Sequence, residues 1–121
     1  MLDSLLKRRL RKGMIAEKAA VHLRAFRRDA EKALPGKVAG VVLFGSRARG
    51  DGRRDSDYDV AVLIRGLDDR RSITHILADA AYPHILAGYH IRPVAIPADL
   101  LTSPSQNSFA MELLRDGVLV S

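Results

Sequence analysis

The chain has 121 residues, a net charge of +6 and no cysteine. This length predicts one domain with a modest core and leaves no room for a separate substrate-binding domain. The lack of cysteine excludes disulfides and thiolate metal sites, and we expect no membrane span because no stretch is long and apolar enough.

The positive charge is concentrated at the N-terminal end of the chain. Residues 1–32 hold ten Lys or Arg and four Asp or Glu, whereas the rest of the chain holds ten of each. A solvated helix face explains this segment most simply, and the alternative is contact with nucleic acid or an acidic partner. Nucleic-acid contact is not favoured, because the basic run at 7–12 contains no aromatic side chain for base stacking.

Two stretches of helical periodicity open the chain. The first spans residues 2–11 and is interrupted at Gly13, and the second runs from about 14 to 34 and ends at Pro35-Gly36. We therefore predict a basic helical N-terminal arm over 1–13 and a single domain over 14–121. The alternative is one long helix that passes through the glycine at some cost. The arm would present an apolar stripe that needs a partner: Leu2, Leu5, Leu6 and Leu10.

The remaining elements alternate between strands and helices. We predict a buried strand over 37–44, a second strand to about 64, a helix over about 70–86 that Pro83 kinks or splits, a strand over 89–96, a helix that begins near a cap at 103–105 and ends at 116–117, and a short edge strand at 118–120. This order predicts an α+β fold with a mixed sheet of three to four strands and helices packed on one side.

The connection between the first two strands carries the chemistry. Gly45 lets the backbone approach a ligand closely, and from Ser46 a short helical turn presents free N–H groups to an anion. Asp57 and Asp59 lie two residues apart, so their carboxylates share one face of the second strand. A divalent cation would relieve their mutual repulsion, and Mg²⁺ is the natural choice because it shares its ligands with substrate phosphates. The two halves together indicate a nucleoside triphosphate.

These residues resemble a known family. Gly45-Ser46, ten intervening residues and Asp57-Tyr58-Asp59 match the GS-x10-DxD signature of the DNA-polymerase-β-like nucleotidyltransferases. The flanking residues, about 41–63, resemble the minimal nucleotidyltransferase (MNT) branch, which is often paired with HEPN toxins. The resemblance implies transfer of AMP from ATP to a hydroxyl, with Asp57 and Asp59 as catalytic and Mg²⁺-binding residues. It also implies a nucleotide-binding set, in which we expect one of the two arginines to face the nucleotide: Gly45, Ser46, Arg47 and Arg49.

The chain departs from the family pattern at one position. The family usually has a third carboxylate on the strand that corresponds here to 89–96, and Arg92 takes its place. An arginine neither binds Mg²⁺ nor accepts a proton at neutral pH, but it can neutralise a carboxylate or bind a phosphate. His90 shares the face of Arg92 by the two-residue period, and is either a base or weak ligand or an ordinary strand histidine.

The resemblance implies an MNT-type antitoxin that modifies a HEPN RNase toxin, with a tyrosine hydroxyl as the expected acceptor. The alternative is a catalytically weak or inactive MNT-fold antitoxin that neutralises its partner by binding. An antibiotic nucleotidyltransferase is disfavoured, because the chain has no domain to hold a small acceptor. The expected partners are ATP and the toxin, in a homo- or hetero-oligomer. Because residues 1–9 lack the features of a signal peptide, we expect a cytoplasmic location.

Overall fold

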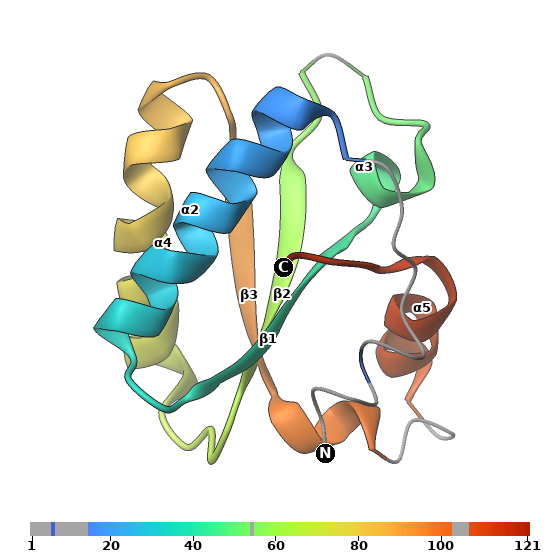
Figure 1. Cartoon of the computed structure of the whole chain (residues 1–121). Coiled ribbons are helices and arrows are strands. Elements are labelled where there is room, and N and C mark those ends of the chain that lie inside the picture. Colours follow the sequence, from blue (N-terminus) through green and yellow to red (C-terminus); the bar gives the residue numbers. More distant parts are fainter. Residues whose placement is uncertain (1–5, 7–14, 54, 103–106) are drawn as a thin grey trace.

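The structure is a computed structural model that describes residues 6, 15–53, 55–102 and 107–121. Four strands form one mixed sheet in the order β3-β2-β1-β4, in which β1 is antiparallel to β2 and β4, and β2 is parallel to β3 (Figure 1). The elements in chain order are α2 (Glu17–Ala33), β1 (Val38–Phe44), α3 (Ser46–Arg49), β2 (Tyr58–Ile64), α4 (Arg70–Leu86), β3 (Ile91–Pro97), the 3-10 helix η1 (Ala98–Leu101), α5 (Ser108–Asp116) and β4 (Val118–Leu119).

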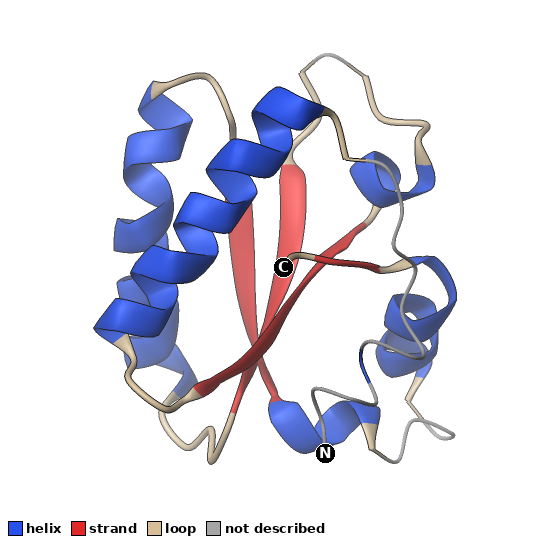
Figure 2. Cartoon of the chain, viewed as in Figure 1, coloured by secondary structure: helices blue, strands red, loops and turns tan. Residues whose placement is uncertain are grey.

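The helices lie on both faces of the sheet. The two long helices, α2 and α4, pack together over one face, and the shorter α5 and η1 cover part of the other (Figure 2). The α+β fold and the four-stranded mixed sheet are as predicted, but the expectation of helices on one side holds for α2 and α4 alone. The reason is that β1 and β2 are apolar on both faces, and each face buries its side chains against a helix.

Two hydrophobic clusters sandwich the sheet. The cluster under α2 and α4 is centred on Phe26 and Leu77, and the cluster on the α5 side is centred on Leu113 and Leu101. The strand residues alternate between the two clusters, as the two-residue period requires: Val41, Leu43, Val60 and Val62 face α2 and α4, whereas Val42, Ala61 and Leu63 face α5 and η1. The sheet is thus the central layer that fixes where the ends of β1, β2 and β3 lie.

The predicted arm over 1–13 lies outside the described residues except for Leu6. The side chain of Leu6 is fully buried in the cluster on the α5 side. A Cβ atom at Gly40 would lie 2.7 Å from Leu6 Cδ1, so the glycine makes room for it. For this residue the prediction of an apolar stripe left for a partner is wrong, because Leu6 fills the core of its own chain.

Several helix boundaries differ from the sequence-based expectations. The first helix begins at Glu17, and α4 continues through Pro83 to Leu86 without splitting. Pro83 has no N–H to donate to the carbonyl four residues earlier, so α4 lacks one hydrogen bond there, and the helix continues for only three residues beyond it. The predicted cap at 103–105 lies outside the described residues, and α5 begins instead at Ser108, with Asn107 Oδ1 accepting a hydrogen bond from Ala110 N at 2.9 Å. Within the described part of the chain, no helix is long and apolar enough to cross a membrane.

A pair of histidines joins α2 to α4. His22 Nδ1 and His84 Nδ1 are 2.9 Å apart, so one ring donates a proton and the other accepts it. His84 is buried, and its Nε2 lies 3.8 Å from Asp29 Oδ2, too far for a hydrogen bond. Burial lowers the pKa of His84, the neighbouring His22 lowers it further, and Asp29 offsets part of this effect. The fold therefore disfavours protonation of His84.

This lowered pKa makes stability depend on pH. Below about pH 6.5 the unfolded chain binds a proton at His84 that the folded protein resists, so stability falls as the pH decreases through this range. We expect thermal melts to show a lower melting temperature at pH 5 than at pH 7.5, and His84→Gln to flatten this dependence. An equal pH dependence in the two proteins would show that other groups govern acid stability.

Candidate active site

The Gly-Ser turn is a compact structure at the end of β1. Gly45 has φ 75° and ψ −157°, a backbone conformation that is essentially restricted to glycine. Its carbonyl accepts hydrogen bonds from the backbone N–H groups of Ala48 and Arg49, each at 3.1 Å, and closes the four-residue helix α3. Gly50 ends this helix in the left-handed conformation, and Asp51 N then donates to Ser46 O at 3.1 Å. The turn is therefore fixed by its own backbone hydrogen bonds.

The two predicted carboxylates lie at the start of β2. Asp59 pairs in register with Phe44 on β1 and with Arg92 on β3, and Asp57 precedes the first residue of the strand. The side chain of Asp57 is 42% exposed and that of Asp59 is 19% exposed. By the two-residue period, Asp59 shares the face of Ala61 and therefore lies on the α5 side of the sheet.

Gly45 of the turn lies close to the carboxylate of Asp59. A Cβ atom at Gly45 would lie 2.9 Å from Asp59 Oδ2, closer than real Cβ contacts. The absence of a side chain at this position thus lets the backbone of the turn lie against the carboxylate. The Gly-Ser turn and Asp59, which the sequence pattern predicted to act on one ligand, thus lie together where β1 ends and β2 begins.

Arg92 bridges both carboxylates. Its Nε donates to Asp59 Oδ1 at 2.8 Å, and a terminal guanidinium nitrogen lies 3.5 Å from Asp57 Oδ2. The guanidinium reduces the repulsion that two neighbouring carboxylates would otherwise exert on each other. His90 lies just before β3, with an exposed side chain, and its carbonyl accepts a hydrogen bond from Tyr58 N at 2.9 Å. None of the polar contacts found among the described residues connects the His90 ring to the carboxylates.

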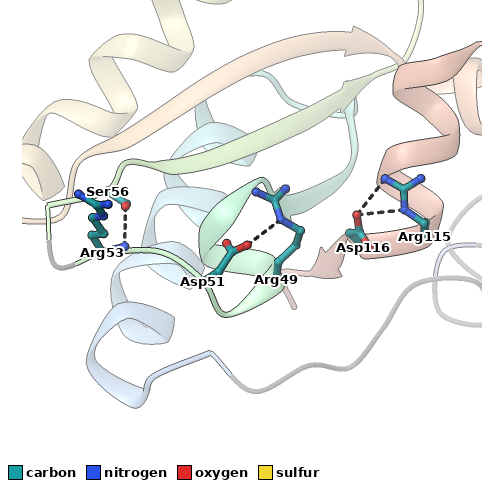
Figure 3. A network of polar contacts seen from close by, with 6 residues as sticks. All are labelled: Arg49, Asp51, Arg53, Ser56, Arg115 and Asp116. Atoms are coloured by element: carbon teal, nitrogen blue, oxygen red, sulfur yellow. Dashed lines mark hydrogen bonds and ion pairs between the residues drawn. The ribbon is translucent and has the colours of Figure 1, made fainter.

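The two arginines of α3 take different directions. Arg47 Nε donates to Ser56 O at 3.2 Å, and its guanidinium carbon lies 4.4 Å from the centre of the Tyr58 ring. Tyr58 faces the α2 and α4 side, opposite to Asp59, so these contacts turn Arg47 away from the carboxylates. Arg49 is exposed and pairs with Asp51 at 3.3 Å (Figure 3).

The loop from α3 to β2 packs against the turn, which sequence reasoning missed. A Cβ atom at Gly52 would lie 3.0 Å from Arg47 Cδ and 3.3 Å from Ser46 Oγ, so this glycine also permits a close approach. The loop is tightened where Arg53 N donates to Ser56 Oγ at 2.7 Å (Figure 3). Gly52 among polar residues indicates a turn in the sequence, but this pattern does not show which residues the turn packs against.

An apolar groove of about 460 Å³ lies on the same sheet face. Phe44, which is opposite Asp59 in the sheet, and Val94, two residues after Arg92, both line it. Phe109 of α5 closes one side and packs edge to face against Phe44, with ring centres 5.2 Å apart. The groove therefore begins beside the carboxylates.

The donor set of the site fits Mg²⁺. Two carboxylates supply the hard oxygen ligands that this ion prefers, and Mg²⁺ normally completes its shell with water and substrate phosphates. Asp59 Oδ2 faces the turn, whereas Oδ1 is bonded to Arg92. Within the described residues, no group of three or more His, Asp or Glu side chains could hold a metal. A metal at this site would thus rely on Asp57, Asp59 and the substrate.

Comparison with known proteins extends the resemblance across most of the chain. The family model described as "Nucleotidyltransferase domain" matches residues 23–102. A protein of Methanocaldococcus jannaschii, named "Putative protein adenylyltransferase", is 30% identical over 81 residues, which cover 67% of this chain and 82% of that protein.

A solved structure supports the same fold. It is titled as a "putative nucleotidyltransferase" from Sulfolobus solfataricus, and it aligns with a TM-score of 0.57 over 89% of this chain and 87% of its own. The identity is 18%, so this match concerns the fold alone. The match to the family model includes the Gly-Ser turn and both aspartates of the DxD segment. The residues around this signature resemble those of the minimal nucleotidyltransferases. The chain belongs to the nucleotidyltransferase domain family, in its MNT-type branch.

Proposed function

We propose that this chain is a Mg²⁺-dependent protein adenylyltransferase that moves AMP from ATP to a hydroxyl group of another protein. The observation that carries the proposal is the close approach of Asp59 Oδ2 to Gly45, where a Cβ atom would lie only 2.9 Å from this oxygen. This proximity supports a metal held by the carboxylate next to phosphates held by the turn, as transfer of a nucleotidyl group requires. The name of the archaeal relative, a protein adenylyltransferase, supports the choice of a protein acceptor.

The proposed reaction is a displacement at the α-phosphorus of ATP. The acceptor oxygen forms a bond to this phosphorus, the bond to the bridging oxygen breaks, and pyrophosphate leaves while the hydroxyl proton passes to solvent. Asp57 and Asp59 would hold Mg²⁺, which supplies neutralisation of the phosphate charge. Ser46 would donate its hydroxyl to the terminal phosphates beside the turn. Arg49, which is exposed, can exchange Asp51 for a phosphate, whereas Arg47 supports the loop.

The acceptor would approach from the groove on the α5 side. Its lining by Phe44, Phe109 and Val94 suits an aromatic side chain, and its start beside Asp59 would bring a tyrosine hydroxyl toward the nucleotide. The biological partner in this proposal is a HEPN-type RNase toxin, and the chain acts as its antitoxin in a cytoplasmic complex. This step is supported by the family resemblance of the Gly-Ser and DxD segment.

Direct transfer of label tests the proposal. The purified chain is incubated with ATP labelled in the α-phosphate and the adenine, with Mg²⁺, and with or without the protein encoded beside it. We expect a mass increase of one AMP on a hydroxyl residue of the partner and no transfer when EDTA replaces Mg²⁺. Absence of label on the partner at every Mg²⁺ concentration would contradict the proposed activity.

A second candidate is an antitoxin that acts by binding alone. The observation that favours it is Arg92, whose guanidinium is ion-paired with both carboxylates where the family usually has a third acid. The double variant Asp57→Asn, Asp59→Asn separates the two functions. Retained neutralisation of the toxin with retained complex formation would support binding, whereas loss of neutralisation in an intact complex would support transfer.

A further inference from the structure

Arg92 stands at the position where it affects both metal ligands at once. It lies opposite Asp59 in the parallel register of β2 and β3, and its guanidinium contacts Asp59 Oδ1 at 2.8 Å and Asp57 Oδ2 at 3.5 Å. A single cationic side chain therefore neutralises part of the charge of the carboxylate pair.

A guanidinium and a divalent cation compete for this carboxylate pair, so each binds it less tightly when the other is present. They repel each other, and Arg92 is hydrogen-bonded to Asp59 and ion-paired with Asp57, the two aspartates that a metal would use. Among the described residues, no third carboxylate lies close enough to offset this competition by adding a metal ligand. Metal binding by Asp57 and Asp59 thus has a competitor that is part of the chain itself.

The same side chain can leave its partners at low cost. Arg92 is 67% exposed, and ion pairs of exposed side chains contribute little to stability. A guanidinium also binds phosphate through two parallel hydrogen bonds, so phosphates that arrive beside the carboxylates offer it a stronger partner. The exchange of carboxylate for phosphate would free Asp57 and Asp59 when the nucleotide is present.

We propose that Arg92 is a positioning residue that couples metal binding to nucleotide binding. In the free protein it occupies the carboxylate pair and weakens metal binding, and in the complex it contacts the phosphates and releases the pair to the metal. The inference rests on the proposed function, because it takes the nucleotide site described above as given. Coupling of this kind is reciprocal, so nucleotide and metal must raise each other's affinity by the same factor.

Metal affinity measured without turnover tests this coupling. Mn²⁺, which replaces Mg²⁺ and is visible by electron paramagnetic resonance, is titrated into the full chain with and without α,β-methylene-ATP, an analogue that cannot transfer AMP. The variants are Arg92→Gln and the control Arg28→Gln, which removes an equal charge from an exposed position of α2 on the other side of the sheet. We expect Arg92→Gln to bind Mn²⁺ alone roughly tenfold more tightly than the wild type, since both an ion pair and a repulsion are removed.

The analogue should raise Mn²⁺ affinity strongly in the wild type and in Arg28→Gln, and less in Arg92→Gln. Arg92→Asp adds a second readout, because a third carboxylate should lower the melting temperature in EDTA and restore it with Mn²⁺. Equal Mn²⁺ affinity in the wild type and Arg92→Gln overturns the inference even if AMP transfer is observed. Tighter binding in Arg92→Gln without any AMP transfer supports the inference and contradicts the proposed function.

Discussion

Replacement of Asp59 by Asn is expected to lower AMP transfer roughly a thousandfold, since a metal-binding carboxylate supplies several kcal/mol to the transition state. Asn keeps the size of the side chain but removes the negative charge that would bind the proposed cation. Asp59 is the more buried aspartate of the pair and the one whose oxygen lies against Gly45. The measurement is the initial rate of label transfer to the partner protein at saturating ATP and Mg²⁺.

A matched control separates this loss from general effects of the substitution. Asp79→Asn changes the same group at an exposed position of α4, on the sheet face opposite to Asp59, and should leave the rate unchanged. The fold of Asp59→Asn should persist, because its partner Arg92 is mostly exposed and remains hydrated when the ion pair is lost. A transfer rate within threefold of the wild type would exclude Asp59 as a metal ligand in the reaction.

Much of the fold follows from local sequence patterns such as apolar runs and helix caps. The strands β1 and β2 are near-continuous apolar runs bounded by glycine and polar residues, and their observed ends lie within about one residue of the predictions. The helix α4 was predicted over its observed range, and Asp69 caps it by accepting from Ser72 N at 3.2 Å. Such signals act over a few residues and are therefore readable from sequence.

The predictions that were wrong depend on contacts between distant parts of the chain. The sequence pattern predicts Leu6 as part of an exposed apolar stripe, whereas in the structure it is buried in the space that Gly40 leaves. The start of α5 was misplaced because Ser103 and Asn107 are both good caps, and local preference does not choose between them. The final helix was predicted, but its place on the second sheet face was not, since sequence order does not state which face a helix covers.

The site shows the same division between local and distant information. The Gly-Ser turn and the DxD strand were found from one continuous segment, and the structure places Gly45 against Asp59. The ion pair of Arg92 with both aspartates requires the parallel register of β2 and β3, which the sequence does not give. Likewise, the contact of Arg47 with Tyr58 depends on how the loop folds back, so spacing alone had left either arginine as a phosphate ligand.

Among glycine-to-alanine substitutions in this turn, Gly45→Ala is expected to reduce AMP transfer the most. Glycine is required twice here: φ 75° with ψ −157° costs other residues about 1 to 3 kcal/mol, and the new Cβ would lie 2.9 Å from Asp59 Oδ2. The substitution must therefore shift either the turn or the carboxylate. We expect a lower melting temperature, and a loss of AMP transfer of roughly a hundredfold, since small displacements of reacting groups have effects of that size.

Gly36→Ala is the control for replacing a glycine of positive φ away from the site. Gly36 has φ 74°, almost the same as Gly45, but a Cβ there would meet no atom within 4 Å, and it lies in the turn between α2 and β1. It should lower stability through its backbone alone and leave both transfer and Mn²⁺ affinity intact. If Gly45→Ala also kept its transfer rate and its Mn²⁺ affinity, the contact between turn and carboxylate would have no role in the reaction. A loss confined to Gly45→Ala would mean that the reaction needs glycine at the end of β1, for its backbone conformation together with the space that it leaves beside Asp59.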